Sequence, residues 1–265
     1  VQNQSELKVI YKSQSKSEKK VILFADTFNI NFEVKNVLYA IRILNKFGYQ
    51  AIIPSFDNDN LDRPLCCGRT YISFGQLDKA KEELNRFIKY IMKSGNFETP
   101  IVGLEPSCLL TFSDEFKTLK GLTNREQLKN KFFLLEEFIL DQIKIKNKIN
   151  HVNFDKEVII HGHCHQKSQN RMKGLFKLLD TFNIKYKMID SSCCGMAGSF
   201  GYNSKNYDIS KKMAYLSLIP EINKTDKNAF ILANGTSCRH QISDFSERKP
   251  KHIAELLFNL FERIN

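Results

Sequence analysis

The sequence contains itself twice, and this internal repeat constrains the fold more than any other feature. Three pairs of segments align: VILFADTF (21–28) with VIIHGHCH (158–165), LCCGRTYISFG (65–75) with SCCGMAGSFG (192–201), and IVGLEPSC (101–108) with ILANGTSC (231–238). The middle pair differs by one residue after the shared Cys-Cys-Gly, and the last pair aligns without a gap. A repeat of this length predicts that both copies fold as the same supersecondary unit.

Within each copy, short apolar blocks alternate with segments of helical periodicity. Strands are predicted at 20–26, 49–55, 100–104, 157–163, 184–190 and 229–234. Helices are predicted at 33–48, near 75–93, at 125–146, at 166–180 and near 203–217. Strands that alternate with helices predict an α/β fold with parallel sheets, flanking helices and right-handed crossovers. We expect two homologous halves related by a pseudo-twofold axis.

The halves give the expected domain organisation. Residues 1–17 are polar and are expected to be a flexible lead-in. Residues 18–150 form the first repeat with a connecting helix, and 151–265 form the second. The chain opens on Val1 and shows no secretory leader, which is expected of a fragment of a longer cytoplasmic protein.

The net charge of +11 raises the question of nucleic-acid binding. The basic residues are mostly lysines scattered among Asn and Ile or interleaved with Glu, so they do not form a stripe that would follow a phosphate backbone. No nucleic-acid partner is expected. A basic face is better suited to an acidic partner or to the anionic inner surface of a membrane, at which the protein would be peripheral. No run of about 20 apolar residues is present.

The seven cysteines carry the strongest chemical information. In a reducing compartment, grouped cysteines indicate metal binding or catalysis more than structural disulfides. Each cysteine follows a predicted strand, at the sheet edge where open α/β sheets bind ligands. The second half has a set of four, namely Cys164, Cys193, Cys194 and Cys238. The first half has three, Cys66, Cys67 and Cys108, because Thr27 takes the fourth position.

Four converging thiolates suit an iron–sulfur cluster or a structural zinc ion. Adjacent ligands such as Cys193 and Cys194 fit two irons of a cluster more easily than one tetrahedral ion, so a cluster is the first hypothesis and zinc the second. Gly195 and Gly198 allow the backbone to approach the sulfur atoms and donate N–H groups. Inert buried thiols are the remaining alternative, since a disulfide between neighbours is strained.

Three histidines and one arginine lie beside these cysteines in sequence. His163 and His165 flank Cys164, and Arg239 and His240 follow Cys238. Alternation along a strand points His163 and His165 away from Cys164, which favours an outer role or proton transfer over direct ligation. The remaining alternative, which applies to His240 as well, is that they are ordinary polar residues at a strand-to-helix turn. Arg239 is a candidate for neutralising the charge of a cluster or an acidic substrate.

These motifs resemble the cysteine-rich CCG domain family, which occurs in heterodisulfide reductase and in the iron–sulfur subunits of glycolate oxidase and anaerobic glycerol-3-phosphate dehydrogenase. The resemblance is greatest to the C-terminal part of FAD-linked iron–sulfur D-lactate and D-2-hydroxyacid dehydrogenases. The motifs that carry it are LCCGR, EPSC, HGHCHQK, CCGMAGSFGY and SCRHQI. The resemblance covers nearly all of residues 18–265.

The resemblance implies an electron-transfer module in which a cluster, expected to be 4Fe–4S, passes electrons from a flavin toward a quinone or other acceptor. It assigns the four second-half cysteines as cluster ligands and places FAD in a separate domain or subunit. Alternatives are a zinc-stabilised docking module and a CCG-type subunit that reduces a disulfide or quinone at its own cluster. The sequence departs from the family where Glu105 and Gly235 replace the first cysteine of C-x-x-C. Cys66, Cys67 and Cys108 therefore bind a metal with Glu105, line a shared pocket, or complete a site across the pseudo-twofold.

Overall fold

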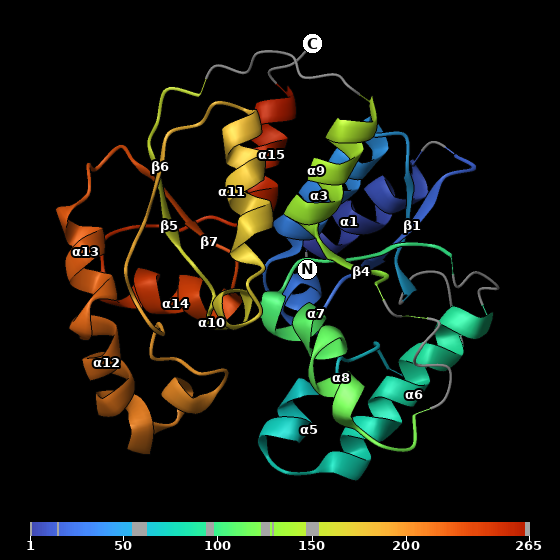
Figure 1. Ribbon diagram of the computed structural model, residues 1–265, viewed down its shortest axis with the longest axis horizontal. Helices are drawn as coiled ribbons and strands as arrows, with labels where there is room; N and C mark the ends of the chain where they lie inside the picture. The colour runs from blue at the N-terminus through green and yellow to red at the C-terminus, as the bar shows by residue number, and fades with distance from the viewer. Residues whose placement is uncertain are drawn as a thin grey trace. The chain divides into compact units, whose positions relative to one another are not determined.

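The chain forms two compact units, Val1–Ile139 and Leu140–Asn265 (Figure 1). They divide within helix α9, Leu135–Lys146, earlier in the chain than the boundary expected after residue 150. A computed structural model describes residues 2–14, 16–54, 63–93, 98–122, 128, 130–146 and 154–262.

The first unit is built on a parallel four-stranded sheet with the strand order β2-β1-β3-β4. Its strands are β1 Lys20–Phe24, β2 Gln50–Ile52, β3 Ile101–Gly103 and β4 Phe132–Leu134. Its helices are α1 Gln2–Lys12, α2 Thr27–Asn31, α3 Val34–Lys46, α5 Arg69–Ser73, α6 Leu77–Lys93, α7 Pro106–Ser113 and α8 Glu115–Thr118, followed by the start of α9.

The structure differs from the expected flexible lead-in, because α1 lies within residues 1–17 and packs on α3. Leu7 of this helix is fully buried. The turn that follows is fixed by Gln14, whose amide group donates to the Ala51 carbonyl at 3.1 Å and accepts from the Ala51 N–H at 2.9 Å. This segment is ordered because one apolar face of the helix is buried. The polar composition of residues 1–17 gave no indication of that face.

The helix predicted over 125–146 is wrong at residues 130–134, and residues 125–127 and 129 lie outside the described part of the chain. Within it, β4 pairs in parallel with β3, and α9 begins only at Leu135. The sequence FFLL at 132–135 has no helical periodicity of its own, and a short apolar run is equally compatible with a buried strand. Pairing with β3 decides between the two.

The second unit repeats this topology in a parallel three-stranded sheet of order β6-β5-β7. Its strands are β5 Val158–His161, β6 Tyr186–Met188 and β7 Phe230–Ala233. Its helices are α10 Cys164–Ser168, α11 Met172–Thr181, η2 Phe200–Tyr202, η3 Ser204–Asn206, α12 Tyr207–Leu216, α13 Leu218–Lys224, α14 Thr236–Phe245 and α15 Ile253–Glu262. In both units the first strand of the repeat lies inside the sheet. The predicted α/β class with parallel sheets and flanking helices is confirmed, and the pseudo-twofold relation stays a prediction.

The helix predicted at 166–180 is interrupted. Chain direction changes at Asn170, whose φ of 56° lies in the left-handed region, so that α10 ends at Ser168 and α11 begins at Met172. Beyond the break, α11 lies beside α15 (Figure 1), with Phe182 and Phe261 in an edge-to-face contact at 5.7 Å. The short α10 is thereby left at the end of β5, where it carries Cys164.

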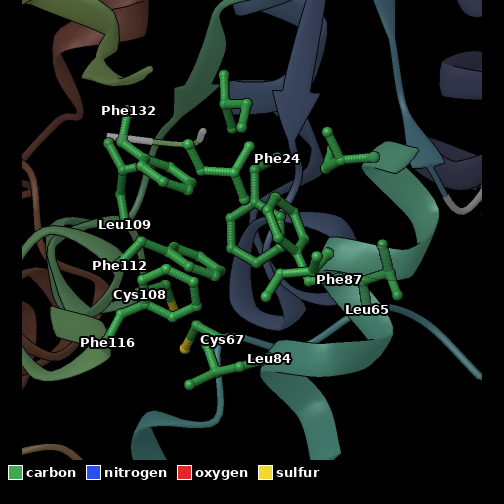
Figure 2. Close-up of a cluster of buried hydrophobic side chains, with 14 of the residues drawn as sticks. Phe24, Leu65, Cys67, Leu84, Phe87, Cys108, Leu109, Phe112, Phe116 and Phe132 are labelled. Atoms are coloured by element: carbon green, nitrogen blue, oxygen red, sulfur yellow. The ribbon is translucent and has the colours of Figure 1, made fainter. Parts of the chain in front are cut away.

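The core of the first unit is an aromatic cluster (Figure 2). Phe112 on α7 stacks on Phe132 of β4 with ring centroids 4.7 Å apart. It also meets Phe24 of β1 edge to face at 5.4 Å and packs against Phe87 of α6 at 4.6 Å. One ring thus contacts three other elements of the unit.

The helices of the described residues include none with the length and apolar character of a membrane span.

The change Phe112→Ala is expected to lower the free energy of unfolding by about 3–5 kcal/mol, because a large buried ring leaves a cavity at the centre of this cluster. The matched control Phe74→Ala removes a ring that is 68% exposed and should change stability by about 0.5 kcal/mol or less. Urea unfolding followed by circular dichroism measures both; equal losses would contradict the assigned centre of the core.

Candidate metal centre

Three segments of the second unit carry its four cysteines, and each segment follows a strand of the sheet. Cys164 is the first residue of α10, directly after β5. Cys193 and Cys194 lie in the loop after β6, and Cys238 lies in the first turn of α14, which follows β7. Figure 1 shows α10 and α14 beside each other at the end of β5. Segments far apart in sequence therefore deliver thiols to one place.

The four thiols form a continuous hydrogen-bonded row. Cys193 is hydrogen-bonded to both Cys164 and Cys194, and Cys194 is hydrogen-bonded in turn to Cys238. Cys164 is exposed, Cys193 is half-buried, and the other two are buried. The row thus runs from the surface into the interior, and all four remain free thiols.

Proximity divides the protons unevenly along this row. The pKa of Cys193 is lowered, first by hydrogen bonds from Cys164 and Cys194, and the pKa of Cys238 is lowered, first by its hydrogen bond with Cys194. The pKa values of Cys164 and Cys194 are raised, first by their hydrogen bonds to Cys193. Neighbouring thiols in the row thus disfavour ionisation of one another, and a cation is needed before all four sulfur atoms can be anionic together.

Backbone N–H groups of the glycine loop point at the same sulfur atoms. The Gly195 N–H donates to Cys193 Sγ at 3.3 Å, and the Ala197 N–H also hydrogen-bonds that sulfur. The Met196 N–H does the same for Cys194. Positive φ angles at Gly195, Ala197 and Gly198 turn successive N–H groups to one side, which makes an anion-binding nest.

Gly195 lies against α12, where no side chain fits. A Cβ atom at this position would collide with the Ser210 carbonyl oxygen and lie 3.1 Å from the amide nitrogen of Gln241. That amide donates to the Ser210 carbonyl at 3.1 Å and to its hydroxyl oxygen at 3.0 Å. Because Gln241 belongs to α14, this contact fixes the nest relative to the helix that carries Cys238.

The predicted histidines take different places. His163 is buried and is the N-cap of α10, where its Nδ1 accepts from the His165 N–H at 3.2 Å. Its ring stacks on that of His165 at 5.4 Å and fills the space where a side chain at Gly235 would lie. His240 is hydrogen-bonded to the Tyr202 hydroxyl. The outer roles of His163, His165 and His240 stay a prediction.

Arg239 is buried and holds the turn between β7 and α14. Its guanidinium donates to the carbonyl oxygens of Ala233 and Asn234, both at 2.8 Å, and to the Thr236 hydroxyl at 3.1 Å. The group therefore positions the first turn of α14, which contains Cys238.

Sequence reasoning did not single out His161, Lys167 and Ser191, which the structure places at this site. His161 ends β5 with its Nδ1 2.9 Å from the Ser191 hydroxyl. Lys167 donates to the carbonyl oxygens of Ser191 and Ser192, directly before the paired cysteines. The position of His161, a polar residue closing a buried strand before a glycine, was the available signal. Among the described residues, one group of possible metal ligands has its donor atoms within 4.8 Å of one another: His161, Cys194 and Cys238.

The first-unit cysteines are packed among aromatic rings, whereas Cys194 and Cys238 lie in an aliphatic cluster. Cys67 and Cys108 are buried in the aromatic cluster beside Phe112 and Phe116 (Figure 2). The pKa of Cys67 is raised well above its usual value, first by its hydrogen bond with Cys108 and then by burial, although a hydrogen bond with Cys66 acts in the opposite direction.

Carboxylates reinforce this difference. A hydrogen bond with Cys67 lowers the pKa of Cys108, but burial and the charges of Asp26 and Glu105 raise it to about 11. Both carboxylates serve as helix caps: Asp26 accepts from the Asn29 N–H at 3.1 Å, and Glu105 accepts from the Ser107 N–H at 3.2 Å. Glu105 is thus used by its own helix.

Comparison with known proteins agrees with the motifs. Residues 158–243 match the model of the CCG family, the cysteine-rich domain, which confirms the resemblance stated from the sequence. The matched range includes all four cysteines of the hydrogen-bonded row.

Three relatives illustrate the range of similar proteins. The chain is 24% identical over 260 residues to D-2-hydroxyglutarate dehydrogenase of Pantoea ananatis, covering 94% of this chain and 23% of that protein. It is 22% identical to one subunit of the anaerobic glycerol-3-phosphate dehydrogenase of Escherichia coli K12, covering 82% of this chain and 53% of that subunit. It is 23% identical to lactate utilization protein A of Oceanobacillus iheyensis, covering 83% of this chain and 88% of that protein. The chain thus spans about a quarter of the length of the first relative.

Gly195→Ala and Gly198→Ala form a matched pair, since both residues have positive φ. A Cβ at Gly198 meets nothing within 4 Å, so this change should cost about 1 kcal/mol of unfolding free energy through strain alone. Gly195→Ala adds the collision with Ser210 and should cost at least about twice as much. Urea denaturation of the two variants measures the difference; equal costs would show that the nest is free to shift.

Asp26→Asn tests the buried carboxyl of the first unit. Burial, and then the charge of Glu105, raise the pKa of Asp26 from 3.8 to about 6. The folded state therefore retains this proton longer than the unfolded state, and the stability that the protonated group contributes is lost as pH rises from about 4 through about 6. Relative to Asp26→Asn, the wild type should lose on the order of 3 kcal/mol across this window.

The measurement is urea unfolding of both proteins at closely spaced pH values between 4 and 7. Asp78→Asn is the control, because it makes the same change at a side chain that is 95% exposed. A wild-type stability that runs parallel to that of Asp26→Asn would refute the raised pKa.

Proposed function

We propose that the second unit holds an iron–sulfur cluster and serves as an electron-transfer module of an oxidoreductase. The observation that carries this proposal is the hydrogen-bonded row of Cys164, Cys193, Cys194 and Cys238 at the ends of three strands. Four cysteine thiolates are the usual ligand set of such clusters.

The donor set favours a cluster over a single ion. Cys193 and Cys194 are adjacent in sequence, which suits two separate irons better than two corners of one tetrahedron. The nest N–H groups already hydrogen-bond both sulfur atoms, and such bonds stabilise negative charge on a bound cluster. The ligand types therefore fit iron and sulfide.

When bound, a cluster of this kind supplies one-electron transfer. The chain's own residues bury Cys194 and Cys238, keep water from the inner side, and leave Cys164 exposed at the surface. The exposed end is where a partner could approach closely. Hydrogen bonds from Gly195, Met196 and Ala197 would raise the reduction potential by offsetting the charge of the thiolates.

The relatives support the oxidoreductase class, since two of those described above are named as a dehydrogenase or as a component of one. We propose that the electron donor is a flavin domain or subunit that oxidises a 2-hydroxy acid, and that the acceptor is a quinone or another carrier. We also propose a cytoplasmic location, peripheral at the inner face of the membrane.

We assign no metal to Cys66, Cys67 and Cys108. Two of these thiols pack in an apolar aromatic cluster, and the nearby carboxylates Asp26 and Glu105 disfavour further negative charge. The first repeat would then retain the cysteine loop as a packing element without its ligand function.

The test is iron and acid-labile sulfide analysis of anaerobically purified protein, with absorbance spectra before and after dithionite. About four irons and four sulfides per chain, with bleaching on reduction, are expected. Cys194→Ser should lose the cluster, whereas Cys67→Ala, the matched change in the first repeat, should keep it. Colourless wild-type protein with about one zinc would refute the electron-transfer proposal, and loss of the cluster in Cys67→Ala would refute the assignment of ligands to the second unit alone.

A further inference from the structure

His161 is a buried histidine with one nitrogen already assigned. It is 2% exposed at the end of β5, and its Nδ1 lies 2.9 Å from the Ser191 hydroxyl oxygen. Its other nitrogen, Nε2, is buried without a hydrogen bond of good geometry to another described residue, and the interaction that His161 makes with Cys238 is with a thiol, a weak hydrogen-bonding group. A buried polar atom left in this state costs free energy unless a ligand satisfies it.

The surroundings of His161 contain thiols in place of the usual hydrogen-bond acceptors. One ring nitrogen of His161 and the sulfur atoms of Cys194 and Cys238 lie within 4.8 Å of one another, and all three residues are buried. Zinc–sulfur and zinc–nitrogen bonds of about 2.3 and 2.0 Å place tetrahedral ligand atoms about 3.5–3.8 Å apart. Small side-chain rotations would therefore bring these three atoms onto one metal ion.

We propose that His161 is a nitrogen ligand of the metal centre, binding through Nε2 the metal atom that Cys194 and Cys238 also bind. The inference rests on the proposed function in assigning a metal to these thiols, but it does not require that metal to be iron.

The first repeat provides an internal comparison. Phe24 occupies the position equivalent to His161, in the alignment of 21–28 with 158–165. Its ring packs edge to face on Phe87 and Phe112 at 5.4 Å, within the apolar cluster that also contains Cys67 and Cys108. In both repeats the inner two thiols are buried in an apolar cluster. The same strand end thus carries an aromatic ring beside the first set of thiols and an imidazole beside the second.

Ser191 positions the proposed ligand. Metal-binding imidazoles commonly hydrogen-bond through the ring nitrogen that faces away from the metal, which fixes the ring orientation and the tautomer. With Nδ1–H donating to the Ser191 hydroxyl, Nε2 presents a lone pair to the metal. Ser191 precedes Cys193 by two residues, so the same loop positions the imidazole and the paired thiols.

The test uses Co²⁺ and Zn²⁺ as probes on the whole chain, reduced and free of iron. Co²⁺ titration should give thiolate charge-transfer bands in wild type, and His161→Gln should weaken Co²⁺ binding at least about tenfold, the lower bound for losing even an outer partner. X-ray absorption of the Zn²⁺-loaded protein should show imidazole scattering in wild type and lose it in His161→Gln. The control His240→Gln, which changes a half-buried histidine two residues after Cys238, should retain the imidazole scattering, because this signal reports only a nitrogen bound directly to the metal.

An all-sulfur zinc shell in wild type, or wild-type Co²⁺ affinity in His161→Gln, would overturn the inference. If His161→Gln does not fold, His161→Phe replaces it in both measurements, because the first repeat accommodates a phenylalanine at the same position. The X-ray absorption spectrum of the Zn²⁺-loaded wild type tests for an imidazole ligand without any variant. If the protein is brown and contains sulfide as purified, but shows only sulfur ligands to zinc after iron removal and Zn²⁺ loading, this inference alone is refuted. Imidazole scattering in a protein that takes up no iron or sulfide would refute the cluster and leave the inference standing.

Discussion

The crowding of four thiols at one sheet edge is the constraint on which the second unit depends. Two thiolate charges about 4 Å apart repel by about 4 kcal/mol at an effective dielectric constant of about 20, and each further charge adds to this. The loop reduces this repulsion with backbone N–H groups, and the thiols reduce it by sharing protons along the row. Gly195 has to be glycine because this arrangement also brings the loop against the Ser210 carbonyl oxygen.

The two repeats show how one backbone pattern supports opposite chemistry. In both, a glycine of positive φ follows the paired cysteines and donates its N–H to the first sulfur: Gly68 to Cys66 at 3.4 Å and Gly195 to Cys193 at 3.3 Å. The surrounding side chains differ. Asp26 caps α2 in the first unit, and His163 caps α10 at the equivalent position in the second. Replacing a carboxylate by an imidazole removes a negative charge beside the sulfur atoms.

Much of this arrangement could be predicted from sequence because the repeat is a direct signal. Two copies of the Cys-Cys-Gly loop at matching distances from apolar strands predict the sheets and the grouping of the cysteines. The interruption at Asn170 and the strand at 132–134 were missed, because a local break and a short apolar run carry no distinctive periodicity. His161 was missed for another reason. Its role depends on which atoms approach its ring from the segments after β6 and β7, and such contacts are properties of the fold.

Metal selection in this chain would therefore depend on the surroundings of the cysteines more than on the cysteines themselves. In the first unit the aromatic rings of Phe112 and Phe116 keep the environment apolar, and the pKa of Cys108 stays near 11. Burial and the nearby carboxylates thus raise the cost of removing protons from such thiols. In the second unit the nest and the imidazoles favour anionic sulfur. The double change His161→Phe and His163→Asp would be expected to keep the fold and lose the metal centre, because the first repeat already accommodates Phe24 and Asp26 at these two positions.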